Sequence, residues 1–263
     1  MSVVALLTDF GAVDPYVGVM KGALLSVAPG ATIVDLLHEV PPQDVAAAAF
    51  VLGASRAYFP LDTIFVAVVD PGVGSARRAI AVEAAGGQRF VGPDNGLLTA
   101  ALAGTRVVRA VELTERRYQR ATLSRTFHGR DLFAPVAGHL ASGVPLEALG
   151  RGIAPSSLAR LPGRRAAPAW RRGRARGRVV WIDRYGNCVT DLPAALVERR
   201  RVRVRAGTFS TERLADSYAS VERGAALAII GSYRLVEIAV RDGSAAVALG
   251  LARGDAVVVE ARR

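Results

Sequence analysis

Residues 64–78 read IFVAVVDPGVGSARR, an unbroken apolar run that ends in a carboxylate. A short continuous run of this kind is typical of a strand buried on both faces, as in a parallel sheet. Ligands of open α/β sheets bind at the carboxyl ends of the strands, where Asp70 is expected to lie. Gly72 and Gly74 allow the backbone to turn tightly after this strand, and Arg77 supplies a partner for the carboxylate. We therefore predict a ligand site at this edge of the sheet.

About the first 150 residues alternate between strand-like and helix-like patterns. Such alternation is typical of a mostly parallel sheet with helices on both faces. Strands are expected at residues 3–7, 32–36, 64–69, 80–83, 89–91 and 107–111, and helices at 16–27, 43–57, 96–102 and 132–141. The pattern predicts an α/β fold class, with an N-terminal α/β/α catalytic domain over residues 1–160.

The sequence pattern changes after residue 160. Residues 161–176 are rich in arginine, proline and glycine without an apolar period, which predicts a linker. Residues 177–263 then hold short strand-like runs punctuated by glycine and aspartate, expected at 178–182, 189–192, 202–205, 227–230, 235–240 and 256–261. These runs predict a smaller C-terminal antiparallel domain that resembles a β-barrel.

The charge of the chain raises the question of a polyanionic partner. The 263 residues carry a formal net charge of +11, which favours RNA or another polyanion. However, Lys21 is the only lysine, and many of the arginines crowd into residues 160–178 and 199–205. An arginine-favouring coding bias explains that distribution, and aromatic residues for stacking on single strands make up only 6%. Nucleic acid is therefore not an expected partner, and a basic RNA-binding protein stays the alternative from another class.

Cysteine usage and hydropathy narrow the class of protein further. Cys188 is the only cysteine, so no internal disulfide can form, and no run of Cys, His and carboxylates has metal-ligand spacing. We therefore expect neither a metal nor a cofactor. Residues 3–7 form too short a run for a signal peptide, and no apolar stretch reaches the roughly 18 residues of a membrane span. A cytoplasmic protein that does not cross a membrane is expected.

Polar motifs follow other predicted strands and are expected at the same edge of the sheet. Thr8-Asp9-Phe10-Gly11 follows the first strand, so Asp9 is a second strand-end carboxylate, whereas Asp14 or Pro15 could simply cap the next helix. The turn at residues 92–96 either contacts a ligand or only connects two elements. His128 precedes a helix and is followed by glycine, and imidazole accepts protons near neutrality. A purely structural role is the alternative for this histidine.

Six motifs in fixed order resemble the S-adenosyl-L-methionine (SAM) hydroxide adenosyltransferase family, the SAM hydrolases related to SAM-dependent halogenases. They are TDFGAVDPYVGVMKG at 8–22, VDPGVGSARR at 69–78, GPDNGLLT at 92–99, TFHGRDLFAP at 126–135, IDRYGN at 182–187 and GSYRLVEIAV at 231–240. Because these segments run from end to end, the resemblance covers essentially the whole chain. On turn chemistry alone, Asp183 to Asn187 would be only a hairpin turn.

The resemblance implies a reaction and a set of residues. The expected reaction is attack of water or hydroxide on the ribose 5′ carbon of SAM, giving adenosine and L-methionine. The implied catalytic residues are Asp70, Arg77 and His128, and Asp9 would hold the ribose hydroxyls. The remaining substrate-binding residues would be Asp14, Tyr16, Asp183 and Ser232 toward methionine, and Phe127, Tyr185 and Asn187 around adenosine. Glu237 is a further implied substrate-binding residue, with no part of the substrate assigned to it. The family also implies a homotrimer, with each site shared between the first domain of one subunit and the second of its neighbour.

The nearest alternative within the family is a halogenase. Halide-using members replace the Asp and His of the triad, whereas this chain has Asp70 and His128. The chain also lacks the halogenase insertion, since only residues 84–89 separate the two predicted strands there. Tyr233 and Arg241 do not match the halogenase arginine pattern near these positions. The residues leave open which member of the triad takes the proton from water.

Overall fold

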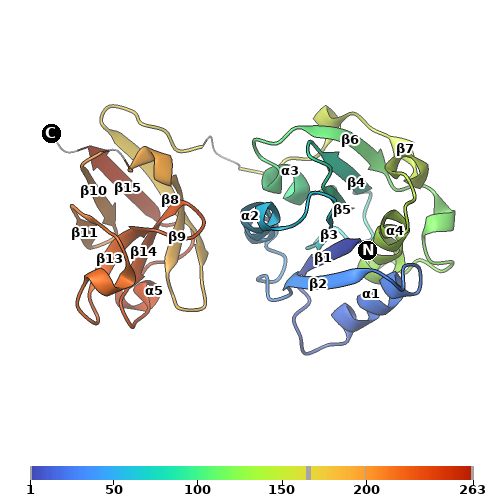
Figure 1. The fold of residues 1–263 in the computed structure, drawn as a ribbon, viewed down its shortest axis with the longest axis horizontal. Helices are drawn as coiled ribbons and strands as arrows, with labels where there is room; N and C mark the ends of the chain where they lie inside the picture. The colour runs from blue at the N-terminus through green and yellow to red at the C-terminus, as the bar shows by residue number, and fades with distance from the viewer. Residues whose placement is uncertain (1, 164–166, 199, 262–263) are drawn as a thin grey trace. The chain divides into compact units, whose positions relative to one another are not determined.

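The computed structural model describes residues 2–163, 167–198 and 200–261. The chain forms two compact units that meet in sequence between residues 164 and 165, inside the stretch predicted as linker (Figure 1). Residues 164–166 of that predicted linker lie outside the described residues. Each unit has its own sheet and its own apolar core.

The first unit is built on a seven-stranded sheet in the order β2-β1-β3-β5-β4-β6-β7. The strands are β1 (Val3–Thr8), β2 (Thr32–Leu37), β3 (Ile64–Val68), β4 (Ala79–Ala84), β5 (Arg89–Pro93), β6 (Val107–Glu112) and β7 (Arg151–Gly152). The pairings among β2, β1, β3 and β5 are parallel, and those among β5, β4, β6 and β7 are antiparallel. The α/β class is confirmed, but the sheet is mixed, because β4 and β5 are joined by a tight hairpin.

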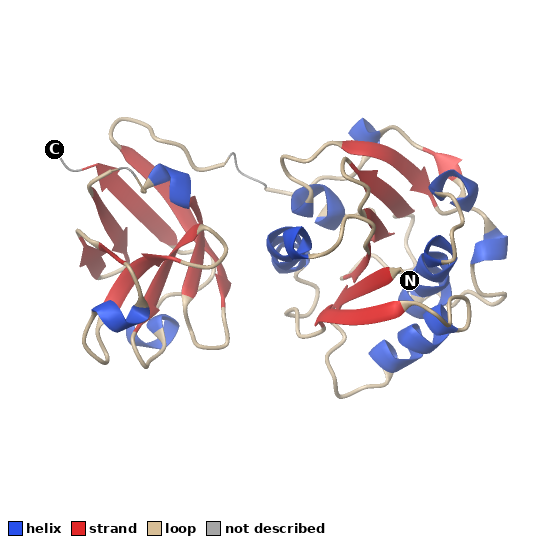
Figure 2. Ribbon diagram, viewed as in Figure 1, coloured by secondary structure: helices blue, strands red, loops and turns tan. Residues whose placement is uncertain are grey.

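Helices cover both faces of this sheet (Figures 1 and 2). Helix α1 (Tyr16–Leu25) packs against α4 (Ala134–Ala141), and α2 (Val45–Ser55) packs against α3 (Leu97–Ala101). One core joins α1 and α4 to the strand residues Val4, Leu6, Ile64, Val66 and Val68. Successive side chains of a strand point to opposite faces of the sheet. The buried residues of β1 and β3 that alternate with these therefore lie on the other face. Both strands are buried on both sides, as the apolar run at 64–69 predicted.

The fourth predicted helix begins differently from the expectation. Residues 129–133 form a single π-helical turn, η3 (Gly129–Phe133), and regular helix starts only at Ala134. Pro135 has no N–H to donate to the Asp131 carbonyl, four residues earlier. That carbonyl instead accepts a hydrogen bond from the Arg120 amide at 2.9 Å. The proline therefore permits the wider turn that follows His128.

The second unit is an eight-stranded sheet in the order β11-β10-β15-β8-β9-β14-β13-β12. Its elements are β8 (Arg174–Ile182), β9 (Cys188–Pro193), β10 (Val202–Ala206), β11 (Phe209–Thr211), β12 (Leu214–Ala215), β13 (Ala226–Ile230), β14 (Leu235–Val240), α5 (Ala245–Ala248) and β15 (Ala256–Ala261). One apolar core includes residues from both halves of the sheet, and β11 approaches β13. The sheet is therefore curled into a nearly closed, barrel-like form, as predicted.

The boundary of the predicted linker is wrong at its C-terminal side. Strand β8 begins at Arg174, so residues 174–176 are strand. Ala175 is buried between the exposed Arg174 and Arg176, which is the alternation of a half-buried strand. This alternation is hard to see in the sequence, because the one buried residue among these arginines is a small alanine.

Candidate functional site

The site begins with an ion pair at the carboxyl end of β3. Asp70 lies two residues after the end of β3. The Arg77 guanidinium donates to both carboxylate oxygens of Asp70, with Nε 3.0 Å from Oδ1 and 3.1 Å from Oδ2. The two side chains are only 6% and 10% exposed. A forked, largely buried pair of this kind holds the carboxylate in a fixed orientation.

Arg77 also binds the histidine of the predicted triad. Its Nη2 atom lies 2.7 Å from His128 Nδ1. Because a guanidinium can only donate, Nδ1 accepts this bond, and the proton of the neutral ring is on Nε2. Burial, and next the charge of Arg77, lower the pKa of His128 below its usual value, against the opposing effect of Asp70 and Asp131. The structure thus brings the three residues of the predicted triad together around one guanidinium.

Asp70 and His128 line a cavity of about 390 Å³ in the first unit, and Arg77 binds both of them from outside its lining. Its lining includes Asp9, Tyr16, Asp70, Phe127 and His128 from the predicted set. The cavity also contacts Phe10, whose ring meets Tyr16 and Phe127 edge to face at centroid distances of 5.9 and 5.7 Å. Three aromatic rings beside fixed carboxylates suit a ligand with a flat apolar part and hydroxyl groups.

Asp9 and Asp14 differ in their surroundings. The Asp9 carboxylate lines the cavity and accepts a hydrogen bond from the Gln43 amide at 2.8 Å, which fixes its rotamer. Asp14 is exposed and does not line the cavity. Pro15 occupies the N-cap position of α1, and no side chain caps that helix. A substrate contact by Asp14 stays a prediction.

A second cavity, of about 760 Å³, lies in the barrel-like unit. It is lined by Asp183, Tyr185, Asn187 and Ser232 from the predicted set, together with Tyr218 and Arg241. The Asp183 carboxylate accepts hydrogen bonds from the amides of Tyr185 and Asn187 and from Asn187 Nδ2, each at 2.9 Å. Asp183 therefore holds the β8–β9 turn in shape and presents Tyr185 and Asn187 to the cavity.

Glu237 lies behind this second cavity rather than in its lining. The side chain is 4% exposed, and the Tyr218 hydroxyl donates to its Oε1 at 2.7 Å. Burial raises the pKa of Glu237, the Tyr218 bond opposes that rise, and the charge of Asp183 adds to it. Tyr218 lines the cavity and is bonded to Glu237 through its hydroxyl, whereas Glu237 is not part of the lining. Direct contact of Glu237 with substrate stays a prediction.

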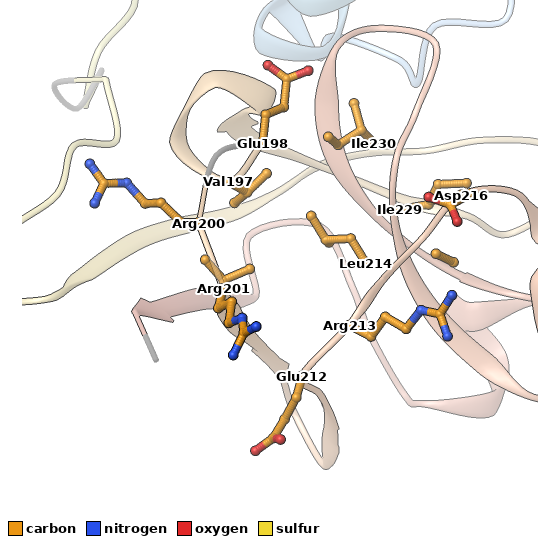
Figure 3. Close-up of a pocket in the computed structure, with 12 residues that line it drawn as sticks. Val197, Glu198, Arg200, Arg201, Glu212, Arg213, Leu214, Asp216, Ile229 and Ile230 are labelled. Atoms are coloured by element: carbon orange, nitrogen blue, oxygen red, sulfur yellow. The ribbon is translucent and has the colours of Figure 1, made fainter. Parts of the chain in front are cut away.

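Another pocket of the second unit contains none of the predicted site residues. It has a volume of about 480 Å³ and is lined by residues of segments 197–202, 212–216 and 229–230 (Figure 3). Its position is the seam where the two ends of the curled sheet face each other. Glu198 and Glu212 of its lining are paired with Arg234 and Arg203. We assign no chemistry to this seam.

Several other functional classes find no support among the described residues. No group of three or more His, Cys, Asp or Glu side chains within 2–163, 167–198 and 200–261 could hold a metal ion. Burial raises the pKa of the Cys188 thiol to about 11, so this cysteine is not a nucleophile at neutral pH. In the part of the chain that the structure describes, no helix is both long and apolar enough to span a bilayer.

Comparison with known proteins bears directly on this arrangement. Residues 4–150 match the model of the SAM hydroxide adenosyltransferase N-terminal domain, and residues 177–258 match that of the C-terminal domain. The chain belongs to the SAM hydroxide adenosyltransferase family. The family resemblance expected from the six motifs is therefore confirmed, and each family domain falls within one of the two compact units.

Individual members of the family are similar over different lengths. A Thermus thermophilus protein named (R)-S-adenosyl-L-methionine hydrolase is 44% identical, over 97% of this chain and 98% of its own. A crystal structure of a conserved protein from Thermotoga maritima aligns with a TM-score of 0.91 and 36% identity, covering 97% of this chain and 99% of that one. An Actinoplanes protein named fluorinase is 31% identical over 60% of each chain.

Several residues that line the cavities were not predicted as site residues, and four of them show why. Phe10 and Val73 lie in the first cavity within motifs already recognised, next to residues that were chosen. Gln43 donates its amide to Asp9 from a left-handed backbone with φ of 63°, which no residue type signals. Tyr218 contacts the second cavity from outside every motif. Only the first two had a signal in the sequence.

Proposed function

We propose that this chain hydrolyses (R)-S-adenosyl-L-methionine to adenosine and L-methionine. The observation that carries the proposal is the Asp70–Arg77–His128 arrangement at the first cavity, in a chain that belongs to the SAM hydroxide adenosyltransferase family. The (R) configuration at the sulfonium is taken from the name of the Thermus relative. The similarity to this relative extends over nearly the full length of both chains, which supports assigning the same activity to this chain.

The difficult part of this reaction is the activation of the nucleophile. The water oxygen forms a bond to C5′ while the C5′–S bond breaks, and the electron pair of that bond goes to sulfur. The sulfonium leaves as the neutral thioether of methionine, so the leaving group needs no proton. Water is a weak nucleophile and must lose a proton and be held in line with the breaking bond. A positioned base typically contributes about 10²–10⁴-fold to such a step.

The hydrogen bonds favour Asp70 as that base. The Nδ1 lone pair of His128 is occupied by the bond from Arg77, and Nε2 carries the proton, so the neutral ring has no free lone pair. A carboxylate offers about four acceptor sites, and Arg77 does not use all of them. Asp70 would take the water proton, His128 Nε2–H would orient the water oxygen, and Arg77 would hold both in place.

The finer features of the family are part of the same proposal. The substrate-binding roles of Asp9, Tyr16, Phe127, Asp183, Tyr185, Asn187 and Ser232 are supported by their places in the two cavities. A homotrimer with shared sites, a reaction independent of metal and cofactor, and a cytoplasmic location are further proposals. They follow from the family resemblance and from the sequence.

A product analysis tests the proposed function. The purified protein is incubated separately with the (R) and (S) epimers of SAM in ¹⁸O-water, with chloride or fluoride present and with or without EDTA. We expect adenosine labelled with ¹⁸O at the 5′ hydroxyl, formed from the (R) epimer at the same rate with the chelator. A 5′-halo nucleoside as the main product would contradict hydrolysis and favour the halogenase alternative. Protection of RNA at physiological salt without turnover of SAM would favour the RNA-binding alternative.

A further inference from the structure

The turn that follows β5 contacts both ends of the loop that carries Asp70 and Arg77. We call residues 70–77, between β3 and β4, the 70–77 loop. Asn95 Nδ2 donates to the carbonyl of Val69, the residue before the loop, at 2.8 Å. Asp94 accepts from Arg78, the residue after the loop, at 2.8 Å from Nε. Two consecutive side chains thus hold the two ends of one loop.

Sheet topology explains why this turn reaches both ends. Strand β5 lies between β3 and β4 in the sheet, so the chain leaving β5 emerges between the two ends of the 70–77 loop. Val66 pairs with Val91 on one side, and Ala79 pairs with Pro93 on the other. Gly92 permits the close approach, because a Cβ there would collide with the Ala67 carbonyl.

The contacts at the second end are charged and largely buried. The Asp94 side chain is 4% exposed and also accepts a hydrogen bond from the Ala159 amide at 2.8 Å. Arg78 donates further to the Ser157 carbonyl at 2.6 Å, and its own carbonyl accepts from the Asp94 amide at 2.9 Å. A buried, charge-assisted pair with these additional bonds is a rigid anchor.

The loop itself is closed by the Asp70–Arg77 pair and by tight turns, such as the bond from the Val73 amide to the Asp70 carbonyl at 3.2 Å. Residues 74–76 are exposed, and Arg77 reaches out of the loop to His128. Neither Asp94 nor Asn95 lines the described cavities, so neither is placed to touch a ligand there. Their contacts act instead on the residues flanking Asp70 and Arg77.

We propose that Asp94 and Asn95 are positioning residues that hold the Asp70–Arg77 pair in line for attack on the substrate. This inference rests on the proposed hydrolysis for its kinetic consequences. It assigns a purpose to the motif at residues 92–96, which sequence reasoning left open between a ligand contact and a mere connection.

Asn95→Asp tests the inference with a minimal change. The substitution keeps the Oδ1 atom that accepts from the Leu97 amide, and it removes the donor to Val69. We expect kcat to fall about 10- to 100-fold, because small displacements of reacting groups are costly, while KM for SAM changes less than about twofold. Arg78→Lys, which keeps the charge but loses the fork to Asp94, should lower kcat in the same direction.

The matched control lies at the other end of the same strand. Gln88 Nε2 donates to the Arg56 carbonyl at 2.9 Å, and its Oε1 accepts from Arg56. Gln88→Glu therefore makes the equivalent amide-to-carboxylate change far from the 70–77 loop. We expect kcat and KM of this variant to stay at the wild-type values, and melting temperatures of all variants should be measured alongside.

A readout that does not need turnover separates this inference from the proposed function. His128 is faced by Arg77, Asp70 and Asp131, and withdrawal of Arg77 should raise the pKa of His128. That pKa can be measured by NMR titration, with the resonance assigned through His128→Asn. A raised pKa in Asn95→Asp or Arg78→Lys, with none in Gln88→Glu, supports the inference even if wild-type protein does not hydrolyse SAM. Wild-type kcat and pKa in both loop-anchor variants, or equal effects in Gln88→Glu, would overturn it.

Discussion

At the scale of single residues, the first cavity depends on one guanidinium that donates to two different acceptors. Arg77 binds Asp70 and His128 at the same time, and it also lies 5.4 Å from the centre of the Phe133 ring. An arginine cannot give up its proton in proteins. It therefore holds the Asp70 carboxylate in a fixed orientation and requires that the neutral His128 ring carry its proton on Nε2.

Substitution of Asp70 and Arg77 should show that the two act as one unit. Asp70→Asn and Arg77→Ala should each lower kcat by about 10²–10⁴-fold, because each removes the oriented base. The double variant should lose little more than either single variant, since groups that act together are strongly non-additive. Steady-state kinetics of the three variants, with SAM binding measured by calorimetry, checks this. Additive losses, or losses confined to binding, would mean that the pair only positions substrate.

The state of His128 sets the expected pH dependence of kcat. Burial, and next the charge of Arg77, lower the pKa of His128 from its ordinary value in the folded protein, so the ring is neutral at neutral pH. Protonation would place a second proton on Nδ1 and remove the acceptor that Arg77 uses. We expect kcat to be constant from pH 8 to neutrality and to fall only at pH values below the ordinary histidine pKa of about 6.5. An acidic limb centred above pH 6.5 in a kcat–pH profile would contradict this assignment.

At the scale of elements, the position of the site follows from strand ends. Asp9 follows β1 and Asp70 follows β3, and these two strands are parallel neighbours. Their carboxyl ends meet at the same edge of the sheet, which is why both carboxylates line one cavity. The antiparallel half of the sheet contributes β4 and β5, whose ends hold the 70–77 loop.

Gly74 at the tip of the 70–77 loop gives a test at this scale. Its φ is +78°, and an added Cβ would lie 2.6 Å from the Arg125 carbonyl oxygen. Gly104 has a similar φ of +81° but open space around the corresponding Cβ position. Gly104→Ala should therefore lose only the backbone cost of about 1–2 kcal/mol with unchanged kcat. Gly74→Ala should lose more stability and also kcat, as measured by chemical denaturation and initial rates. Equal losses would mean that the loop moves freely away from Arg125.

The sequence predicted those elements whose signal is local. Uninterrupted apolar runs such as 64–69, and motifs at strand ends such as Thr8 to Gly11, placed the strands and the first cavity. The start of β8 was missed because alanine is its one inward residue among arginines. The π-helical turn after His128 depends on Pro135 and on the distant Arg120 amide, and the contact of Gln43 with Asp9 spans 34 positions. Contacts between remote segments produce no periodic pattern in the sequence, so they could not be predicted from it.

At the scale of the whole molecule, nine of the predicted site residues line one of two cavities, and each cavity lies in one unit. The first cavity is lined by Asp9, Tyr16, Asp70, Phe127 and His128, and the second by Asp183, Tyr185, Asn187 and Ser232. The residues expected around adenosine and methionine are therefore split between the two cavities. The family resemblance implies that one subunit supplies the first set and a neighbour supplies the second, within a trimer.

Complementation between two inactive variants tests that arrangement. Asp70→Asn disables the first unit, and Asp183→Ala disables the second by releasing the turn that presents Tyr185 and Asn187. If each site joins units from different subunits, random mixing of the two chains should restore about a quarter of the sites. Co-expressed and co-purified variants should then show activity well above either parent, in particles with the mass of a trimer by light scattering. If every site is built from a single chain, the mixture can show no more activity than the parents, because each chain carries one disabled unit.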